Sequence, residues 1–178
     1  MKLQVAGRMK DYEEGIFQLL NEKKKEVEKT GKKVYNLSVG TPDFQTEEHI
    51  LKAVMEAAGN SDNYKYSLGM IPELAEAVIR RFAHRYHVAL SKEEITDVYG
   101  SQEGIAHIAL SLCDPGDVVL VPNPGYPIFS IGPSLALADV RTYDLKPENE
   151  YLPVLSEMDE ELLKKTKFMI VSYPLNPV

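Results

Sequence analysis

The chain has 178 residues, 44% hydrophobic and 26% charged, a composition typical of a globular protein that buries a real core. A net charge of −7 and a pI near 5.2 argue against nucleic acid or an anionic membrane as the main partner. The single cysteine, Cys113, forms no internal disulfide, and no apolar run is long enough for a membrane span or signal peptide, so a cytoplasmic location is expected.

The first part of the chain predicts an arm, a helix and a short strand. Residues 1–12 show no periodicity and are expected to form the arm. Apolar residues recur at helical spacing over 13–29, and Gly31 is expected to end that helix. A short strand is expected over 34–39, followed by the turn Gly40-Thr-Pro-Asp43.

Two more helices are predicted before residue 90. Thr46 is expected to cap the first, which ends at Gly59, and the second runs from Pro72, a residue suited to a helix start, to about His87. A polar loop rich in tyrosine joins them.

From Ile95 onward, short apolar strands alternate with helices. The expected order is strand 95–99, helix 102–113, strand 118–121, helix 126–137, strand 139–145, a helix opening at Ser156 or Asp159, and strand 167–172. Continuous apolar strands separated by helices predict an α/β fold with a mainly parallel sheet flanked by helices. In such sheets ligands bind beyond the carboxyl ends of the strands.

The first of these strand ends predicts an anion site. The strand stops at Gly100, and Ser101 and Gln102 open the following helix. Free backbone N–H groups at a helix N-terminus bind anions, most often phosphate. The alternative is an ordinary strand-to-helix turn with a serine cap.

The other two strand ends add an aromatic ring and an amide. Tyr126 lies in the stiff turn Pro124-Gly-Tyr-Pro127, and Asn176 lies between prolines after the last strand. A phosphate site, a stacking ring and a hydrogen-bonding amide together suggest a phosphorylated aromatic cofactor, with a nucleotide equally allowed by these residues alone.

Five motifs, in this order, resemble the fold-type I, pyridoxal-phosphate-dependent aminotransferases of class I and II. They are Gly40-Thr-Pro-Asp43, Tyr64-xx-Ser67-x-Gly69, Gly100-Ser-Gln-Glu-Gly104, Pro124-Gly-Tyr-Pro127 and Tyr173-Pro-x-Asn176-Pro. The resemblance extends from about residue 13 to the end. It implies an arm and the start of the small domain over 1–45, and the first half of the cofactor-binding large domain, incomplete here, over 46–178.

The resemblance implies pyridoxal 5′-phosphate as cofactor and a role for each strand end. Ser101 and the backbone amide of Gln102 would hold the phosphate. Tyr126 would stack on the pyridine ring, and Asn176 would hydrogen-bond the 3-oxygen of that ring.

The resemblance also implies a homodimer with a shared site. Gly40 would approach the carboxylate of an amino-acid or 2-oxo-acid substrate with its backbone. Tyr64, with Tyr66 as the alternative, would reach the phosphate bound in the neighbouring subunit.

The motif variants look most like the LL-diaminopimelate and aspartate aminotransferase branch, with three departures. Gly15 stands where that branch usually has a tyrosine, Gln102 where a lysine is frequent, and Phe129 where many relatives have a second tyrosine.

Family members are roughly twice as long, and the lysine that forms the Schiff base with the cofactor lies in their later half. We therefore expect an aminotransferase of which these residues alone are inactive. The alternative is a non-catalytic, truncated association module that keeps part of the cofactor site. A small nucleotide-binding protein is disfavoured because no Gly-x-Gly-x-x-Gly pattern occurs, and a metal site at His84 and His87 lacks a third ligand.

Overall fold

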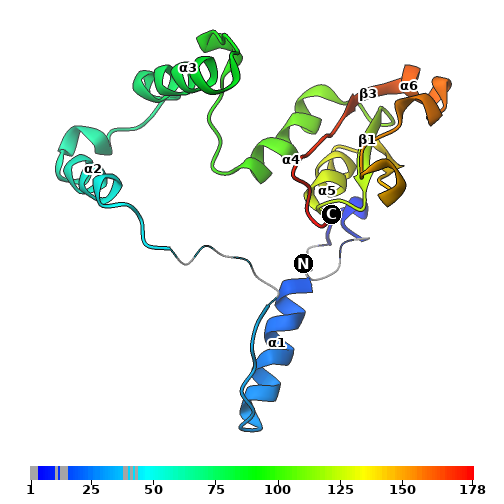
Figure 1. Ribbon diagram of the computed structural model, residues 1–178, viewed down its shortest axis with the longest axis horizontal. Coiled ribbons are helices and arrows are strands. Elements are labelled where there is room, and N and C mark those ends of the chain that lie inside the picture. The colour runs from blue at the N-terminus through cyan, green and yellow to red at the C-terminus, as the bar shows by residue number, and fades with distance from the viewer. Residues whose placement is uncertain (1–3, 11, 13–15, 38–39, 41, 43) are drawn as a thin grey trace. The chain divides into compact units, whose positions relative to one another are not determined.

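A computed structural model describes residues 4–10, 12, 16–37, 40, 42 and 44–178. The chain divides into two compact units (Figure 1). One consists of residues 13–97, and the other combines residues 1–12 with residues 98–178. The predicted domain boundary at residue 45 stays a prediction.

In the unit formed by residues 13–97, the regular secondary structure of the described residues is helical. It contains α1 (Ile16–Lys29), α2 (Glu48–Gly59) and α3 (Pro72–Tyr86), with short 3-10 helices at η2 (Ser61–Tyr64) and η3 (Lys92–Glu94). Proline at the first position of α3 and a left-handed residue directly after its last turn match the preferences of helix ends. All three long helices were predicted from the sequence.

Three sequence predictions in this region and at its boundary were wrong. α2 is preceded by Glu47, not capped by Thr46, and no side chain caps it. Residues 34–37 form no strand, while residues 38 and 39 lie outside the described part. Residues 95–99 form no strand either. A β-favouring run becomes a strand only where a neighbouring strand accepts its backbone hydrogen bonds, and the described residues provide none here.

The other unit is an α/β layer. Its elements are η1 (Gly7–Met9), α4 (Ser101–Leu112), β1 (Val118–Asn123), α5 (Ile128–Leu135), β2 (Asp139–Asp144), η4 (Pro147–Asn149), η5 (Leu155–Glu157), α6 (Glu160–Lys165) and β3 (Thr166–Met169). The strands form a parallel sheet in the order β2-β1-β3. The predicted fold class is thereby confirmed.

The middle strand, β1, is the core of this unit. Its first five residues are buried, as expected for a parallel strand covered on both faces. Val119, Leu120 and Val121 pack with Phe129 of α5 and with a further set of buried side chains: Tyr143, Leu145 and Leu175. Residues from the ends of β2 and from beyond β3 therefore share one core with β1.

Helix α5 packs against α4, β1 and β2 (Figure 1). The close approach of α4 and α5 depends on Gly132, because a Cβ atom there would lie 3.0 Å from the Cα atom of Ala106. The N-terminal arm joins the same layer, since the hydroxyl of Tyr12 is hydrogen-bonded to that of Ser134 on α5.

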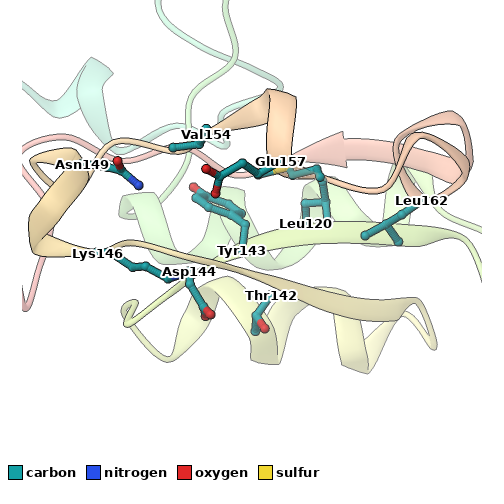
Figure 2. A pocket seen from close by; sticks show the side chains of 10 residues that line it. Leu120, Thr142, Tyr143, Asp144, Lys146, Asn149, Val154, Glu157 and Leu162 are labelled. Carbon is teal, nitrogen blue, oxygen red and sulfur yellow. The ribbon is translucent and has the colours of Figure 1, made fainter.

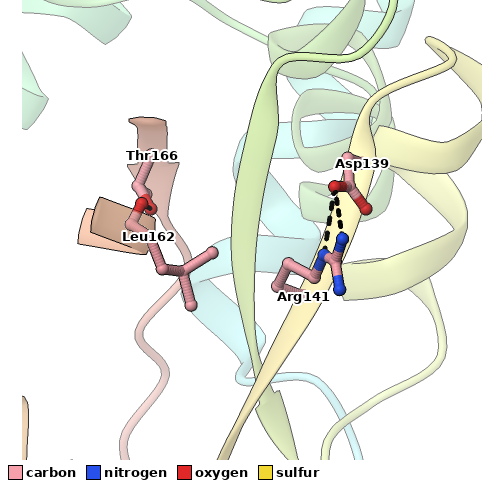
Figure 3. Close-up of polar contacts among 4 residues, drawn as sticks. All are labelled: Asp139, Arg141, Leu162 and Thr166. Carbon is pink, nitrogen blue, oxygen red and sulfur yellow. Dashed lines mark hydrogen bonds and ion pairs between the residues drawn. The ribbon is translucent and has the colours of Figure 1, made fainter. Parts of the chain in front are cut away.

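Short polar contacts fix the ends of the outer strands. On β2, Arg141 donates two hydrogen bonds, of 3.0 and 2.9 Å, to one carboxylate oxygen of Asp139 (Figure 3). At the start of β3, the hydroxyl of Thr166 donates to the carbonyl oxygen of Leu162 across 2.8 Å. Among the described helices, none combines the length and the apolar character needed to cross a membrane.

Candidate functional site

The carboxyl ends of the three strands form one edge of the sheet. In the β1–β2 register, the last residue of β1, Asn123, lies opposite Asp144, the last residue of β2. β3 runs parallel on the other side of β1, and its continuation at Ile170 donates its backbone N–H to Leu120 across 2.9 Å. The segments that follow these strands therefore start from the same edge.

The N-terminus of α4 carries the predicted phosphate-binding residues. Gly100 precedes the helix with a φ of 104°, a left-handed conformation that favours glycine. No side chain caps the helix, so its first backbone N–H groups, at Ser101 and Gln102, have no partner within the helix. Glu103 accepts a hydrogen bond from the backbone N–H of Tyr99 across 2.5 Å, which closes the turn.

The turn after β1 also needs glycine. A Cβ atom on Gly125 would lie 2.5 Å from the carbonyl oxygen of Pro122, closer than real Cβ contacts allow. This tight turn leads directly to Tyr126. The ring of Tyr126 packs edge to face on buried Phe129, with 6.2 Å between the ring centroids.

The structure brings two of the predicted residues into contact. The side-chain amide of Gln102 donates a hydrogen bond to the phenolic oxygen of Tyr126 across 3.1 Å. The sequence prediction used only the backbone amide of Gln102, so this side-chain contact is an addition. Ser101 lies next to Gln102 in the same first turn of α4.

A second polar pair at this edge was missed by the sequence analysis. The side-chain amide of Asn123 donates to a carboxylate oxygen of Asp144 across 2.8 Å, and the backbone N–H of Leu145 donates to the carbonyl oxygen of Asn123 at the same distance. The two bonds fasten the start of the turn that carries Tyr126 to the end of β2. The available signal was a polar residue close to the end of each of two neighbouring predicted strands.

Asn176 lies on the segment after β3, and its side chain is exposed. Two contacts hold that segment. The hydroxyl of Tyr143 donates to the carbonyl oxygen of Ile170 across 2.7 Å, and Leu175 is buried in the core. Burial raises the pKa of Tyr143 to about 12, with a smaller contribution from Tyr173, so its phenol stays protonated at neutral pH.

The remaining predicted site residues, Gly40, Tyr64 and Tyr66, lie in the helical unit. A Cβ atom on Gly40 would have no neighbour within 4 Å inside the described structure. The hydroxyl of Tyr64 donates to the carbonyl oxygen of Ala58 across 2.7 Å, whereas Tyr66 is 90% exposed. The strand-end residues belong to the other unit, so the roles of these three residues stay predictions.

Comparison with known proteins assigns the family. The family model described as "Aminotransferase class I and II" matches residues 32–178. The chain belongs to the class I and II aminotransferase family. This membership confirms the resemblance that the five motifs indicated.

The curated relatives of this aminotransferase-family chain include an LL-diaminopimelate aminotransferase of Aquifex aeolicus. It is 38% identical over 175 residues, which are 97% of this chain and 45% of the relative. "Transaminase BacF" of Bacillus subtilis is also 38% identical, over 90% of this chain and 41% of its own length. The chain therefore spans somewhat less than half the length of these relatives.

Solved structures show the same fold. The apo-BacF structure from Bacillus subtilis matches with a TM-score of 0.92 at 36% identity, over 100% of this chain and 46% of that protein. An alanine aminotransferase from Pyrococcus furiosus matches with a TM-score of 0.87 at 28% identity, over 98% of this chain and 45% of that protein. The sheet and helices described above are thus the corresponding part of a fold-type I aminotransferase.

Proposed function

We propose that the carboxyl edge of this sheet binds pyridoxal 5′-phosphate for amino-group transfer between an L-amino acid and a 2-oxo acid. The observation that supports this most directly is the hydrogen bond between Gln102 and Tyr126. It joins the helix N-terminus suited to a phosphate to the aromatic ring suited to a pyridine. The family generally uses this cofactor.

The phosphate end of the proposed site consists of Ser101 and the first turn of α4. The hydroxyl of Ser101 and the backbone N–H of Gln102 are hydrogen-bond donors at the positive end of a 12-residue helix. Gly100 keeps side-chain bulk away from that turn. This donor set fits the oxygens of a phosphate monoester.

The ring end consists of Tyr126 and Asn176. Tyr126 offers an aromatic face for stacking, and the tight turn at Gly125 fixes the backbone that carries it. The Asn176 amide would donate to the 3-oxygen of the ring. When bound, the cofactor supplies an electron sink for the amino-acid carbon, and these side chains orient it and set its charge.

The helical unit contributes three further residues to the proposed site, namely Gly40, Tyr64 and Tyr66. Gly40 would leave room for the substrate carboxylate, and Tyr64, or Tyr66 in its place, would contact the phosphate of a second subunit in a homodimer. The open space around Gly40 and the exposure of both tyrosines are compatible with contacts to another subunit or to a substrate.

The proposed substrates are of the LL-diaminopimelate or aspartate type. This choice rests on the motif variants and on the names of the relatives and of a similar solved structure. We also propose a cytoplasmic location, in line with the single cysteine, Cys113.

We expect a polypeptide of these 178 residues to bind the cofactor without catalysing transamination. The reaction needs a lysine amine to hold the cofactor covalently and to move a proton at the substrate carbon. None of the lysines in the sequence stands at the family's catalytic position. Formation of a 2-oxo acid from an L-amino acid by this polypeptide alone would refute the expectation.

Binding of pyridoxine 5′-phosphate tests the proposed site. This alcohol analogue has no aldehyde, so it does not react with surface lysines, and its fluorescence reports binding. We expect Ser101→Ala to lower its affinity by about tenfold, the effect of losing a hydrogen bond to a charged group. The affinity for pyridoxine, which lacks the phosphate, should not change.

Ser111→Ala is the matched control, because Ser111 lies near the other end of α4 and donates only to the carbonyl oxygen of His107. Equal affinities of the Ser101 and Ser111 variants for pyridoxine 5′-phosphate would contradict the proposed phosphate site.

A second candidate function is a non-catalytic association module. Large apolar side chains are exposed on α4, where Ile108, Leu110 and Leu112 are 46%, 58% and 49% exposed. Such surface favours contact with another chain. Stable self-association together with no affinity for pyridoxine 5′-phosphate would favour this candidate over the cofactor site.

A further inference from the structure

A cavity of about 260 Å³ lies over the sheet, away from the proposed cofactor residues. It is formed by β1, β2, the segment from η4 to η5, and α6 (Figure 2). Figure 2 shows the side chain of Tyr143 on the side of the sheet that faces Glu157 and Asn149. Thr142 and Asp144, its neighbours in β2, point to the opposite side, as the alternation along a strand requires.

Part of the cavity lining is apolar. Leu120 of β1 is 1% exposed, and Met158 and Leu162 pack against the same core. Val154 and the ring of Tyr143 complete the apolar lining. A short aliphatic chain would find a matching surface here.

The lining also contains several polar side chains, and three of them differ in their chemistry. Lys146 provides an ammonium group, Asn149 a carboxamide, and Glu157 a carboxylate. In the described part of the chain, none of these three groups forms a hydrogen bond or ion pair with another residue. By contrast, Asp144 already accepts the hydrogen bond from Asn123.

The backbone that presents Lys146 and Asn149 is held firmly. The carbonyl oxygen of Lys146 accepts hydrogen bonds from the backbone N–H groups of Asn149 and Tyr151, at 3.1 and 3.0 Å. Glu150 and Tyr151 both have a positive φ, a conformation that non-glycine residues rarely adopt. The hydroxyl of Tyr173 donates to the carbonyl oxygen of Tyr151 across 2.6 Å and fastens this turn to the segment after β3.

We propose that this cavity binds a small aliphatic L-amino acid at a site separate from the cofactor site. The ligand's ammonium group pairs with Glu157, its carboxylate with Lys146 and Asn149, and its side chain covers Val154 and Leu162. A volume of about 260 Å³ is slightly below that of pockets for drug-sized ligands, about 300–1,000 Å³, and suits a smaller ligand. The site would let the protein respond to an amino acid that is not being transaminated.

L-leucine and two analogues test the recognition. We expect L-leucine to bind in a calorimetric titration. 4-Methylpentanoate, which lacks the ammonium group, and 3-methylbutylamine, which lacks the carboxylate, should each bind at least about tenfold more weakly, because each loses one charged contact. Equal binding of leucine and either analogue, or no binding of leucine, would overturn the proposal.

Two variants assign the two charged contacts. Lys146→Met should weaken L-leucine binding about tenfold while leaving the amine unaffected, and Glu157→Gln should weaken leucine binding while leaving the acid unaffected. Lys164→Met and Glu161→Gln are the matched controls, since these residues pair with each other on α6, 2.7 Å apart, and do not line the cavity. Circular dichroism of each variant verifies folding.

These experiments distinguish a failure of the cavity proposal from a failure of the proposed cofactor site. Leucine that occupies the cofactor site instead would bind equally well to the Lys146→Met and Lys164→Met variants, and this result would count against the cavity. Loss of pyridoxine 5′-phosphate binding alone would contradict the proposed function and leave the leucine result standing, because Ser101 and Tyr126 do not line the cavity.

Discussion

The side-chain amide of Gln102 donates a hydrogen bond to the phenolic oxygen of Tyr126 across 3.1 Å. These residues are separated by 24 positions, and the bond connects the first turn of α4 with the turn that follows β1. Gln102 would thus have two separable roles in the proposed site: its backbone N–H would face the phosphate, while its side chain would orient the ring proposed to stack on the cofactor.

A double-mutant cycle separates these two roles. We expect Gln102→Ala to lower the affinity for pyridoxine 5′-phosphate by about threefold, because an exposed neutral hydrogen bond contributes about 0.5–1 kcal/mol and the backbone N–H is retained. In a Tyr126→Phe background the same change should have no further effect. Fluorescence titration of the four proteins measures the coupling, and additive losses would show that the side chain of Gln102 does not act through Tyr126.

Replacing Gly125 by alanine should destabilise the sheet unit. The added Cβ atom would meet the carbonyl oxygen of Pro122 at 2.5 Å, and rigid backbone leaves little room to relax. We expect a loss of about 1–3 kcal/mol in the free energy of unfolding, the usual range for overpacking. Gly7→Ala is the control, because a Cβ atom there has no neighbour within 4 Å. Equal denaturation midpoints of the two variants would contradict this reading of the turn.

Local sequence patterns were sufficient for the elements that form the sheet layer. The apolar run at Val118 predicts a strand buried on both faces, and Gly100 predicts the start of α4, because each depends on residues adjacent in the chain. The run at 95–99 has similar β-propensity but forms no strand, since a strand also needs a partner that no local pattern specifies.

The same distinction applies to the candidate site. Ser101, Gln102 and Tyr126 were identified from turn chemistry, which is local. The bonds from Gln102 to Tyr126 and from Asn123 to Asp144 join residues 24 and 21 positions apart, so they depend on how elements pack. The cavity beside Glu157 was not predictable for the same reason: its lining residues come from separate elements.

Because of Tyr143, the free energy of unfolding should fall at alkaline pH. Its pKa is raised from 10.0 to about 12, chiefly by burial, so the folded protein favours the neutral phenol. The protonated phenol contributes to the free energy of unfolding in full below pH 10. This contribution, on the order of 2–3 kcal/mol, is lost as the pH rises toward 12. Tyr143→Phe removes this dependence and costs about 1 kcal/mol at neutral pH through the lost hydrogen bond to Ile170.

Urea denaturation of the wild type and the Tyr143→Phe variant between pH 8 and about pH 12 measures the difference. Tyr99→Phe, at a residue 98% exposed, is the matched variant that reports the general alkaline behaviour of the chain. If the wild type and the Tyr143 variant lose stability in parallel over this range, the phenol does not titrate as its burial requires.

The bond between Asn123 and Asp144 should hold the turn that carries Tyr126. Asn123→Asp places two carboxylates opposite each other at the end of β1 and β2, so their repulsion replaces a hydrogen bond of 2.8 Å. Because the pair is exposed, we expect a cost of only about 0.5–1 kcal/mol, concentrated at this edge. The exchange variant Asn123→Asp with Asp144→Asn restores an amide facing a carboxylate and should recover most of the loss.

Hydrogen exchange at the backbone N–H of Leu145, which donates to the carbonyl oxygen of Asn123, reports this edge directly. Protection that falls in the single variant and returns in the exchanged pair would establish the contact, whereas equal protection in all three proteins would show that the two side chains do not hold the turn.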